Sequence, residues 1–211
     1  NGYVWNTATP LGESYYETAR YMLGYSADYG KASQWPDSAA AQSASYVYNS
    51  PLDGGQCQSN NIIVLTDGAP TNDGGNRSVG AACSNSFDCM NKSAEYLKKT
   101  GKAGAGGEKS LVTTYTIGFG PDVIDPNSSA YKGLANVARV YGGGEFFAAE
   151  DVDSLADSFQ TIFSRIADTS GTMASPGVAV NQLNRSQHLD QLYYGVFEPT
   201  TNRRWAGNVK R

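Results

Sequence analysis

Two kinds of hydrophobic pattern run along this chain. Apolar residues spaced three to four apart predict helices over 11–23, 90–99, 131–141 and 152–166. Short apolar runs predict strands at 62–66, 111–119 and 145–148. Strands that alternate with helices indicate parallel strands joined by right-handed crossovers. The expected fold class is therefore α/β, a doubly wound and mostly parallel sheet with helices on both faces.

The strand at 62–66 has the strongest pattern. Its run Ile-Ile-Val-Leu-Thr is rich in β-branched residues, which predicts a central strand covered on both faces. Asp67 and Gly68 follow it directly. Because ligands of parallel sheets gather at the carboxyl ends of the strands, Asp67 is a candidate binding residue. A purely structural interpretation, in which Asp67 only shapes a turn, stays open on this pattern alone.

A second candidate oxygen precedes the first predicted helix. Thr9 and Pro10 stand before that helix, and Gly24 ends it. A threonine hydroxyl and an aspartate carboxylate are hard donors, which suit Mg²⁺, Mn²⁺ or Ca²⁺. The alternative for Thr9 is a helix N-cap. Asp73 is a further acid nearby, and its Asn-Asp-Gly context favours a structural turn.

The pattern changes near the end of the chain. The helix at 152–166 has the clearest apolar rhythm, with Asp151 as its expected N-cap. Beyond about residue 175, apolar runs follow one another as strands with no helix between them. We therefore expect one domain over 1–170, with an insertion at 25–60 that holds a helix near 38–46. Residues 171–211 are expected to form a linker and the first strands of a β-rich domain.

Composition favours an extracellular setting. Charged residues make up only 17% of the 211 residues, and the chain holds 24 Gly and 14 Tyr. The mean hydropathy is −0.43. A net charge of −4 offers no broad basic surface, so we expect no nucleic-acid partner. No apolar run approaches the roughly 20 residues that span a bilayer, so we expect no membrane insertion.

The chain has three cysteines. Cys83 and Cys89 enclose a short polar loop that a disulfide could close. Cys57 is then free or bonded to a cysteine outside this chain. No Cys-x-x-Cys pair occurs and the single histidine lies far away, so a zinc site is not expected. This usage favours an oxidising compartment.

Nothing in the sequence favours an enzyme. His188 is the only histidine, and no serine or cysteine elbow accompanies it. The glycine-rich stretches at 101–107 and 142–144 lack the Gly-Lys-Ser/Thr or Gly-x-Gly-x-x-Gly patterns of nucleotide-binding loops. A binding or structural function is therefore expected.

Three motifs, in this order, resemble the von Willebrand factor A domain: Thr-Pro-Leu-Gly-Glu from Thr9, the strand ending in Asp67-Gly68, and Tyr-Thr-Ile-Gly-Phe-Gly from Tyr115. The resemblance implies a Rossmann-like fold with a metal-ion-dependent adhesion site, in which Thr9 and Asp67 bind a divalent cation. The family's Asp-x-Ser-x-Ser loop does not occur here. The chain begins without Met, so we expect an internal piece that lacks the family's first strand and helix.

A second resemblance covers nearly the whole chain. Tyr-Asn-Ser-Pro from Tyr48, Leu-Thr-Asp-Gly-Ala-Pro-Thr from Leu65, Ala-Ser-Pro from Ala174 and Arg-Trp-Ala-Gly-Asn-Val-Lys from Arg204 are similar to the PilC/PilY family of type IV pilus tip adhesins. In that family a von Willebrand factor A region leads into a β-propeller.

This second resemblance implies an exported protein at the pilus tip on the bacterial surface. Its expected functions are adhesion, pilus biogenesis, twitching motility and virulence. Its expected partners are minor pilins and a receptor on host cells or abiotic surfaces. The alternative is a structural or force-sensing pilus-tip domain with a degenerate metal site.

Overall fold

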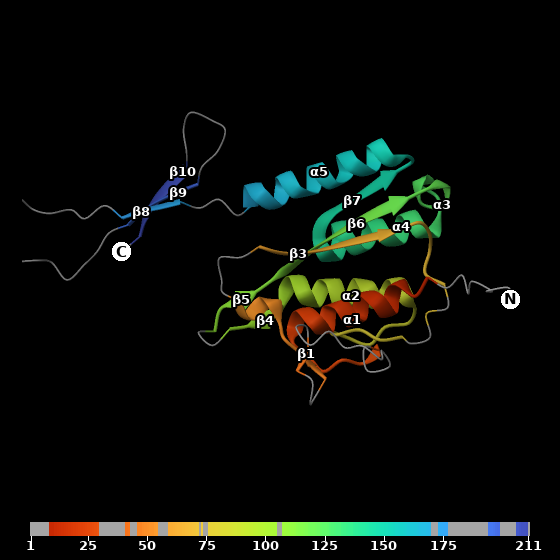
Figure 1. Ribbon diagram of the computed structural model, residues 1–211, viewed down its shortest axis with the longest axis horizontal. Coiled ribbons are helices and arrows are strands. Elements are labelled where there is room, and N and C mark those ends of the chain that lie inside the picture. Colours follow the sequence, from red (N-terminus) through yellow and green to blue (C-terminus); the bar gives the residue numbers. More distant parts are fainter. Residues whose placement is uncertain are drawn as a thin grey trace, which may run out of the picture. The chain divides into compact units, whose positions relative to one another are not determined.

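The computed structural model describes most of the chain before residue 169 and three short strands after it. It divides into two compact units, Asn1–Ser164 and Arg165–Arg211. Figure 1 labels their elements. The described residues are 9–29, 41–42, 46–54, 59–71, 73, 76–104, 107–169, 173–176, 194–198 and 206–210.

A parallel sheet of three strands forms the middle of the first unit. Its strands are β3 (Asn60–Thr66), β6 (Val112–Phe119) and β7 (Gly143–Ala149), in the order β3-β6-β7. In register, Thr66 of β3 lies opposite Gly118 of β6, so the carboxyl ends of both strands meet at one edge. The structure is thus mixed α/β with helices flanking a parallel sheet, as the sequence predicts (Figure 1).

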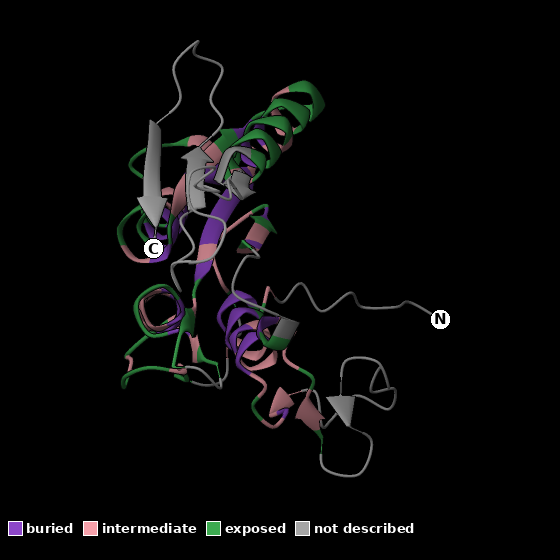
Figure 2. Ribbon diagram, turned by 90° about the vertical axis from the view of Figure 1, so that its left-hand side faces the viewer, coloured by how far each residue is buried: buried purple, intermediate pink, exposed green. Residues whose placement is uncertain are grey.

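The helices follow the predicted order. The buried core joins apolar side chains of the first helices to the sheet, with Met90, Leu97, Ile117 and Leu134 fully buried. Figure 2 shows the buried residues gathered on the sheet and the helices packed on it. The helices are α1 (Leu11–Leu23), α2 (Ser86–Lys99), α3 (Pro121–Ile124), α4 (Ser129–Ala135), a π-helix (Asn136–Gly142) and α5 (Val152–Thr169).

Short elements surround this core. Part of the predicted insertion packs on α1, where the Ser50 hydroxyl donates a 2.5 Å hydrogen bond to the Met22 carbonyl. Ala41 and Gln42 form a strand, so the helix predicted near 38–46 is wrong at these positions. These elements are β1 (Ala41–Gln42), β2 (Val47–Tyr48), the 3₁₀ helix η2 (Pro51–Gly54), β4 (Lys102–Ala103) and β5 (Lys109–Ser110).

One prediction about the sheet needs correction. Within the described residues β3 pairs only with β6, so it lies at the edge of the sheet and not at its centre. Leu65 is accordingly 50% exposed. The apolar stripe of α5 is also only partly covered: Ile162 is buried, but Val152 is 73% and Phe163 58% exposed. Hydrophobic periodicity predicts an apolar stripe on the helix, but it does not predict which element packs against that stripe.

The second unit contains a small antiparallel sheet. Its strands are β8 (Met173–Pro176), β9 (Tyr194–Glu198) and β10 (Ala206–Lys210), in the order β10-β9-β8. The expected helix-free pattern near the end of the chain agrees with these strands. That they open a propeller-like domain stays a prediction. None of the helices described is long and apolar enough to cross a membrane.

Candidate functional site

A hollow of about 380 Å³ lies at the carboxyl edge of the sheet, and it contains both residues that the sequence selected. Thr9 comes from the segment before α1, and Asp67 follows β3. Phe119 at the end of β6 and Leu155 of α5 add apolar walls. The structure therefore brings together two candidate residues that lie far apart in the sequence. The remaining lining residues are Pro10, Leu11, Ser14, Leu65 and Thr66.

Thr9 is held in place by the loop that follows Asp67. Its backbone N–H donates a 2.9 Å hydrogen bond to the Thr71 hydroxyl, and the Thr71 N–H donates to the Thr9 carbonyl at 3.0 Å. The two threonines thus form an isolated antiparallel bridge across 62 positions of sequence. This bridge fixes the segment before α1 beside the end of β3.

The N-cap alternative for Thr9 is wrong. Pro10 occupies the N-cap position of α1 and no side chain of the cap bonds to the helix. Asp73 does this instead: its carboxylate accepts the N–H of Gly12 at 2.9 Å and that of Glu13 at 3.4 Å. A negative charge at a helix N-terminus is stabilising. Asp73 is therefore structural, as expected, but as a cap supplied from a distant loop.

Gly12 lets this cap approach. A Cβ at Gly12 would lie 2.9 Å from an Asp73 carboxylate oxygen and 3.2 Å from the Cβ of Ser86 at the start of α2. The absence of a side chain thus allows α1, α2 and the Asp73 loop to meet beside the hollow.

A local turn orients Asp67. The Thr66 hydroxyl accepts the Gly68 N–H at 3.3 Å and lies 3.1 Å from the Gly68 carbonyl, to which it donates. Thr66 itself is buried, whereas Asp67 is exposed. No hydrogen bond or ion pair joins the Asp67 carboxylate to another of the described residues. The turn thus presents one carboxylate at the open face of the hollow.

The donors around the hollow are all oxygens. The hydroxyl-bearing residues Thr9, Ser14 and Thr66 accompany the Asp67 carboxylate. Hydroxyls and a carboxylate suit a hard cation such as Mg²⁺, which keeps several waters and needs only one or two carboxylates. The donor set thus fits a divalent cation in type. The described residues contain no cluster of three or more His, Cys, Asp or Glu side chains that could hold a metal.

Sequence reasoning did not select Ser14 or Thr66. Ser14 lies on α1 one turn after Pro10, so helical spacing was the signal that could have placed it beside Thr9. Thr66 directly precedes Asp67, and a threonine before a turn glycine is a known hydrogen-bonding pattern. Neither residue carries a charge, so an expectation based on acids at strand ends does not include them.

A buried contact ties α1 to the sheet and so positions the hollow. The hydroxyls of Tyr15 on α1 and Thr114 on β6 lie 2.6 Å apart, and both residues are buried. Burial raises the pKa of Tyr15 well above its ordinary value, and the hydrogen bond to Thr114 opposes this rise only in part. Tyr15 therefore stays a neutral phenol in the folded protein.

The sulfur atoms of Cys83 and Cys89 lie 2.07 Å apart, a disulfide-bonding distance. Cys89 belongs to α2 and is almost fully buried. The bond therefore closes the loop that leads into this helix, where the sequence expected a disulfide. It is also compatible with an extracellular protein. Cys57 lies outside the described residues.

No protein-family model matches the chain, and a search of curated proteins and of solved structures found no match either.

Proposed function

We propose that this chain is a non-enzymatic binding domain of a type IV pilus tip adhesin. It acts in attachment to cells or surfaces, in pilus biogenesis and in twitching motility. One observation carries the proposal: Thr9 and Asp67, the residues assigned to the metal by the family resemblance, line the same hollow. The expected partners are minor pilins and a surface receptor, and the expected location is the bacterial surface.

The oxygens of the hollow define how it would work. Asp67 supplies the charge for a divalent cation, and the hydroxyls of Thr9 and Ser14 supply neutral donors from the start of α1. When bound, such a cation offers an open coordination position that attracts an acidic group of a partner. The apolar side chains of Leu65, Phe119 and Leu155 form the rest of the surface that a partner would contact.

Metal binding tests the first half of this proposal. The 211-residue chain is titrated with Mn²⁺, and free Mn²⁺ is followed by electron paramagnetic resonance. We expect Asp67→Asn to weaken binding by at least about tenfold, because it removes the carboxylate of the hollow. Thr9→Val, which keeps the branched shape without the hydroxyl, should weaken it less.

Asp53→Asn is the matched control, since Asp53 pairs with Lys102 at the surface and does not line the hollow. Equal Mn²⁺ affinities for Asp67→Asn and Asp53→Asn would contradict a metal at this position.

Adhesion tests the second half. Beads coated with the chain are expected to adhere to cultured epithelial cells in Mg²⁺ and to detach in EDTA. The Asp67→Asn chain should adhere no better than beads without protein. If Mn²⁺ binding depends on Asp67 but adhesion does not, the hollow binds a metal and the adhesive function is wrong.

A structural or force-sensing pilus-tip domain is the second candidate. It is favoured by the single carboxylate among the described residues of the hollow and by the bond between Cys83 and Cys89. This function predicts that a chain with both cysteines replaced by serine impairs twitching motility, whereas Asp67→Asn does not. Normal motility of the cysteine variant would contradict it.

A further inference from the structure

A second hollow of about 600 Å³ runs along the exposed side of α1. It adjoins the first hollow, because Pro10 and Ser14 line both. Three phenol rings and two carboxylates form its walls, and none of its described lining residues is basic. We call it the tyrosine groove. Its defining residues are Glu13, Glu17, Thr18, Tyr21, Tyr29 and Tyr48.

Glu17 holds the walls of the groove together. Its carboxylate accepts the N–H of Asp28 at 3.0 Å, the N–H of Tyr29 at 3.1 Å and the hydroxyl of Tyr48 at 2.5 Å. The Tyr48 ring in turn meets Tyr21 edge to face, with ring centroids 5.6 Å apart. Two segments that lie apart in the sequence are thus fixed onto α1, which keeps the groove preformed.

Two tyrosines of the groove, Tyr29 and Tyr48, stay neutral. Burial, followed by the neighbouring carboxylate of Glu17, raises the pKa of Tyr48. Burial and then Glu13 likewise raise the pKa of Tyr29. Neutral phenols keep electron-rich faces, which attract cations, and the two glutamates add negative charge beside them. The groove therefore has the chemistry of a cation site with an aromatic wall.

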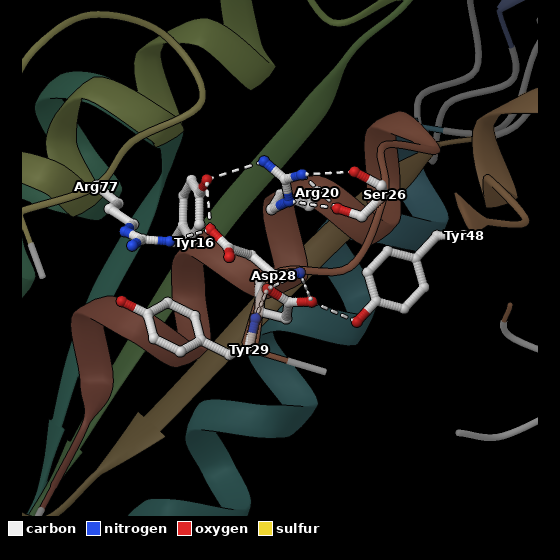
Figure 3. A network of polar contacts seen from close by, with 8 residues as sticks. Tyr16, Arg20, Ser26, Asp28, Tyr29, Tyr48 and Arg77 are labelled. Atoms are coloured by element: carbon white, nitrogen blue, oxygen red, sulfur yellow. Dashed lines mark hydrogen bonds and ion pairs between the residues drawn. The ribbon is translucent and has the colours of Figure 1, made fainter. Parts of the chain in front are cut away.

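Two guanidinium groups of the chain itself lie over tyrosine rings of this part of the protein, one of them over Tyr29 of the groove. The guanidinium of Arg20 lies 5.3 Å from the centre of the Tyr16 ring and donates to the Ser26 carbonyl. That of Arg77 lies 5.5 Å from the centre of the Tyr29 ring and pairs with Asp28. Figure 3 shows both arginines reaching into this network. An arginine over a tyrosine with an oxygen acceptor beside it is thus a repeated local arrangement.

We propose that the tyrosine groove binds an arginine side chain of a partner protein. The guanidinium would stack on the Tyr21 and Tyr48 walls and pair with the carboxylate of Glu13, which already interacts with Tyr29 and can accept further hydrogen bonds. Arginine suits this site better than lysine because its guanidinium is planar and weakly hydrated. It can stack on an aromatic ring while it donates two parallel hydrogen bonds to a carboxylate. This binding needs no metal and goes beyond the function proposed above.

The test uses three blocked tripeptides, acetyl-Gly-X-Gly-amide, in which X is arginine, lysine or citrulline. Citrulline keeps the shape of arginine without its charge. The 211-residue chain carries ring-labelled tyrosine and is titrated in EDTA, with binding followed by NMR. We expect shifts confined to Tyr21, Tyr29 and Tyr48. The arginine peptide should bind about tenfold more tightly than the citrulline peptide, and more tightly than the lysine peptide.

Two variants test whether the carboxylate of Glu13 binds the arginine. Glu13→Gln should weaken arginine binding about five- to tenfold, whereas Glu95→Gln, an equal charge change on α2, should leave it unchanged. Tyr21→Leu should weaken binding through the loss of a ring, and circular dichroism checks that each variant is folded. Equal binding of arginine and citrulline, an unaffected Glu13→Gln chain, or shifts at other tyrosines would overturn the proposal. Because EDTA is present, these results do not depend on the Mn²⁺ experiment.

Discussion

Asp73 caps helix α1 from a distant loop: its carboxylate accepts a 2.9 Å hydrogen bond from the N–H of Gly12, 61 positions earlier in the chain. The cap lies beside the bridge between Thr9 and Thr71. Both contacts connect the segment after β3 to the start of α1. Contacts between these two segments therefore shape the candidate site.

Loss of this cap should be measurable in stability. Asp73→Ala leaves two N–H groups of α1 without their acceptor, so we expect the free energy of unfolding to fall by about 1 kcal/mol. Asp73→Asn keeps one acceptor oxygen and should cost less. Urea unfolding monitored by circular dichroism measures both. In the control Asp53→Ala, which removes only an exposed ion pair, the change should stay within about 0.5 kcal/mol.

The contact between Tyr15 and Thr114 predicts that substitutions of the two residues have non-additive effects on the free energy of unfolding. Tyr15→Phe leaves the buried Thr114 hydroxyl without its partner, so we expect a loss of about 1–3 kcal/mol of unfolding free energy. Thr114→Val should have a similar effect. In the double variant both polar groups are gone, so its loss should be smaller than the sum of the two single losses. Additive losses in urea unfolding would contradict the contact.

Removal of the bond between Cys83 and Cys89 should destabilise the first unit. Closing so short a loop is worth about 2 kcal/mol in the chain-entropy description. We expect the chain with both cysteines replaced by serine to lose about that much unfolding free energy. A reducing agent should lower the urea midpoint of the original chain and leave that of the variant unchanged. An identical midpoint with and without reductant would contradict the bond.

The N-cap of α5 predicts a specific titration. Hydrogen bonds from the Ser154 hydroxyl and N–H lower the pKa of Asp151 below its ordinary range. Because the folded pKa is the lower one, the stability from this cap is fully present above about pH 4 and is lost as the pH falls through the folded pKa. NMR titration of Asp151 measures it, and Ser154→Ala should raise the pKa. An unchanged titration in that variant would contradict the hydrogen bond from the Ser154 hydroxyl.

Local patterns predicted the elements best. The apolar spacing and Gly24 correctly predicted the bounds of α1. Gly24 adopts the left-handed conformation at the end of this helix, with φ of 72°. Asp151 was correctly expected at the start of α5. Helix α2 begins at Ser86, earlier than predicted, because the Asn85 side chain accepts the Asp88 N–H. That cap lies inside a polar loop, so hydrophobic periodicity gave no sign of it.

Features that depend on distant partners were harder to predict. The segment 136–142 continues α4 as a π-helix, and near its start the Thr116 hydroxyl of β6 donates to the Leu134 carbonyl. A bond from a strand to a helix carbonyl leaves no mark in the helix sequence. Asp73 was likewise assigned to a turn, since nothing in its neighbours points to α1. The tyrosine groove was not predicted either, because its walls come from segments that lie apart in the sequence.

The pairing of Tyr15 with Thr114 has a consequence for protein synthesis. The two residues lie 99 positions apart, so a ribosome adding about 5–20 residues per second makes α1 roughly 5–20 seconds before its strand partner. During that interval Tyr15 lacks its buried hydrogen-bond partner on β6. We therefore expect a chaperone to bind ribosome-bound chains truncated before β6 more strongly than chains that extend beyond it.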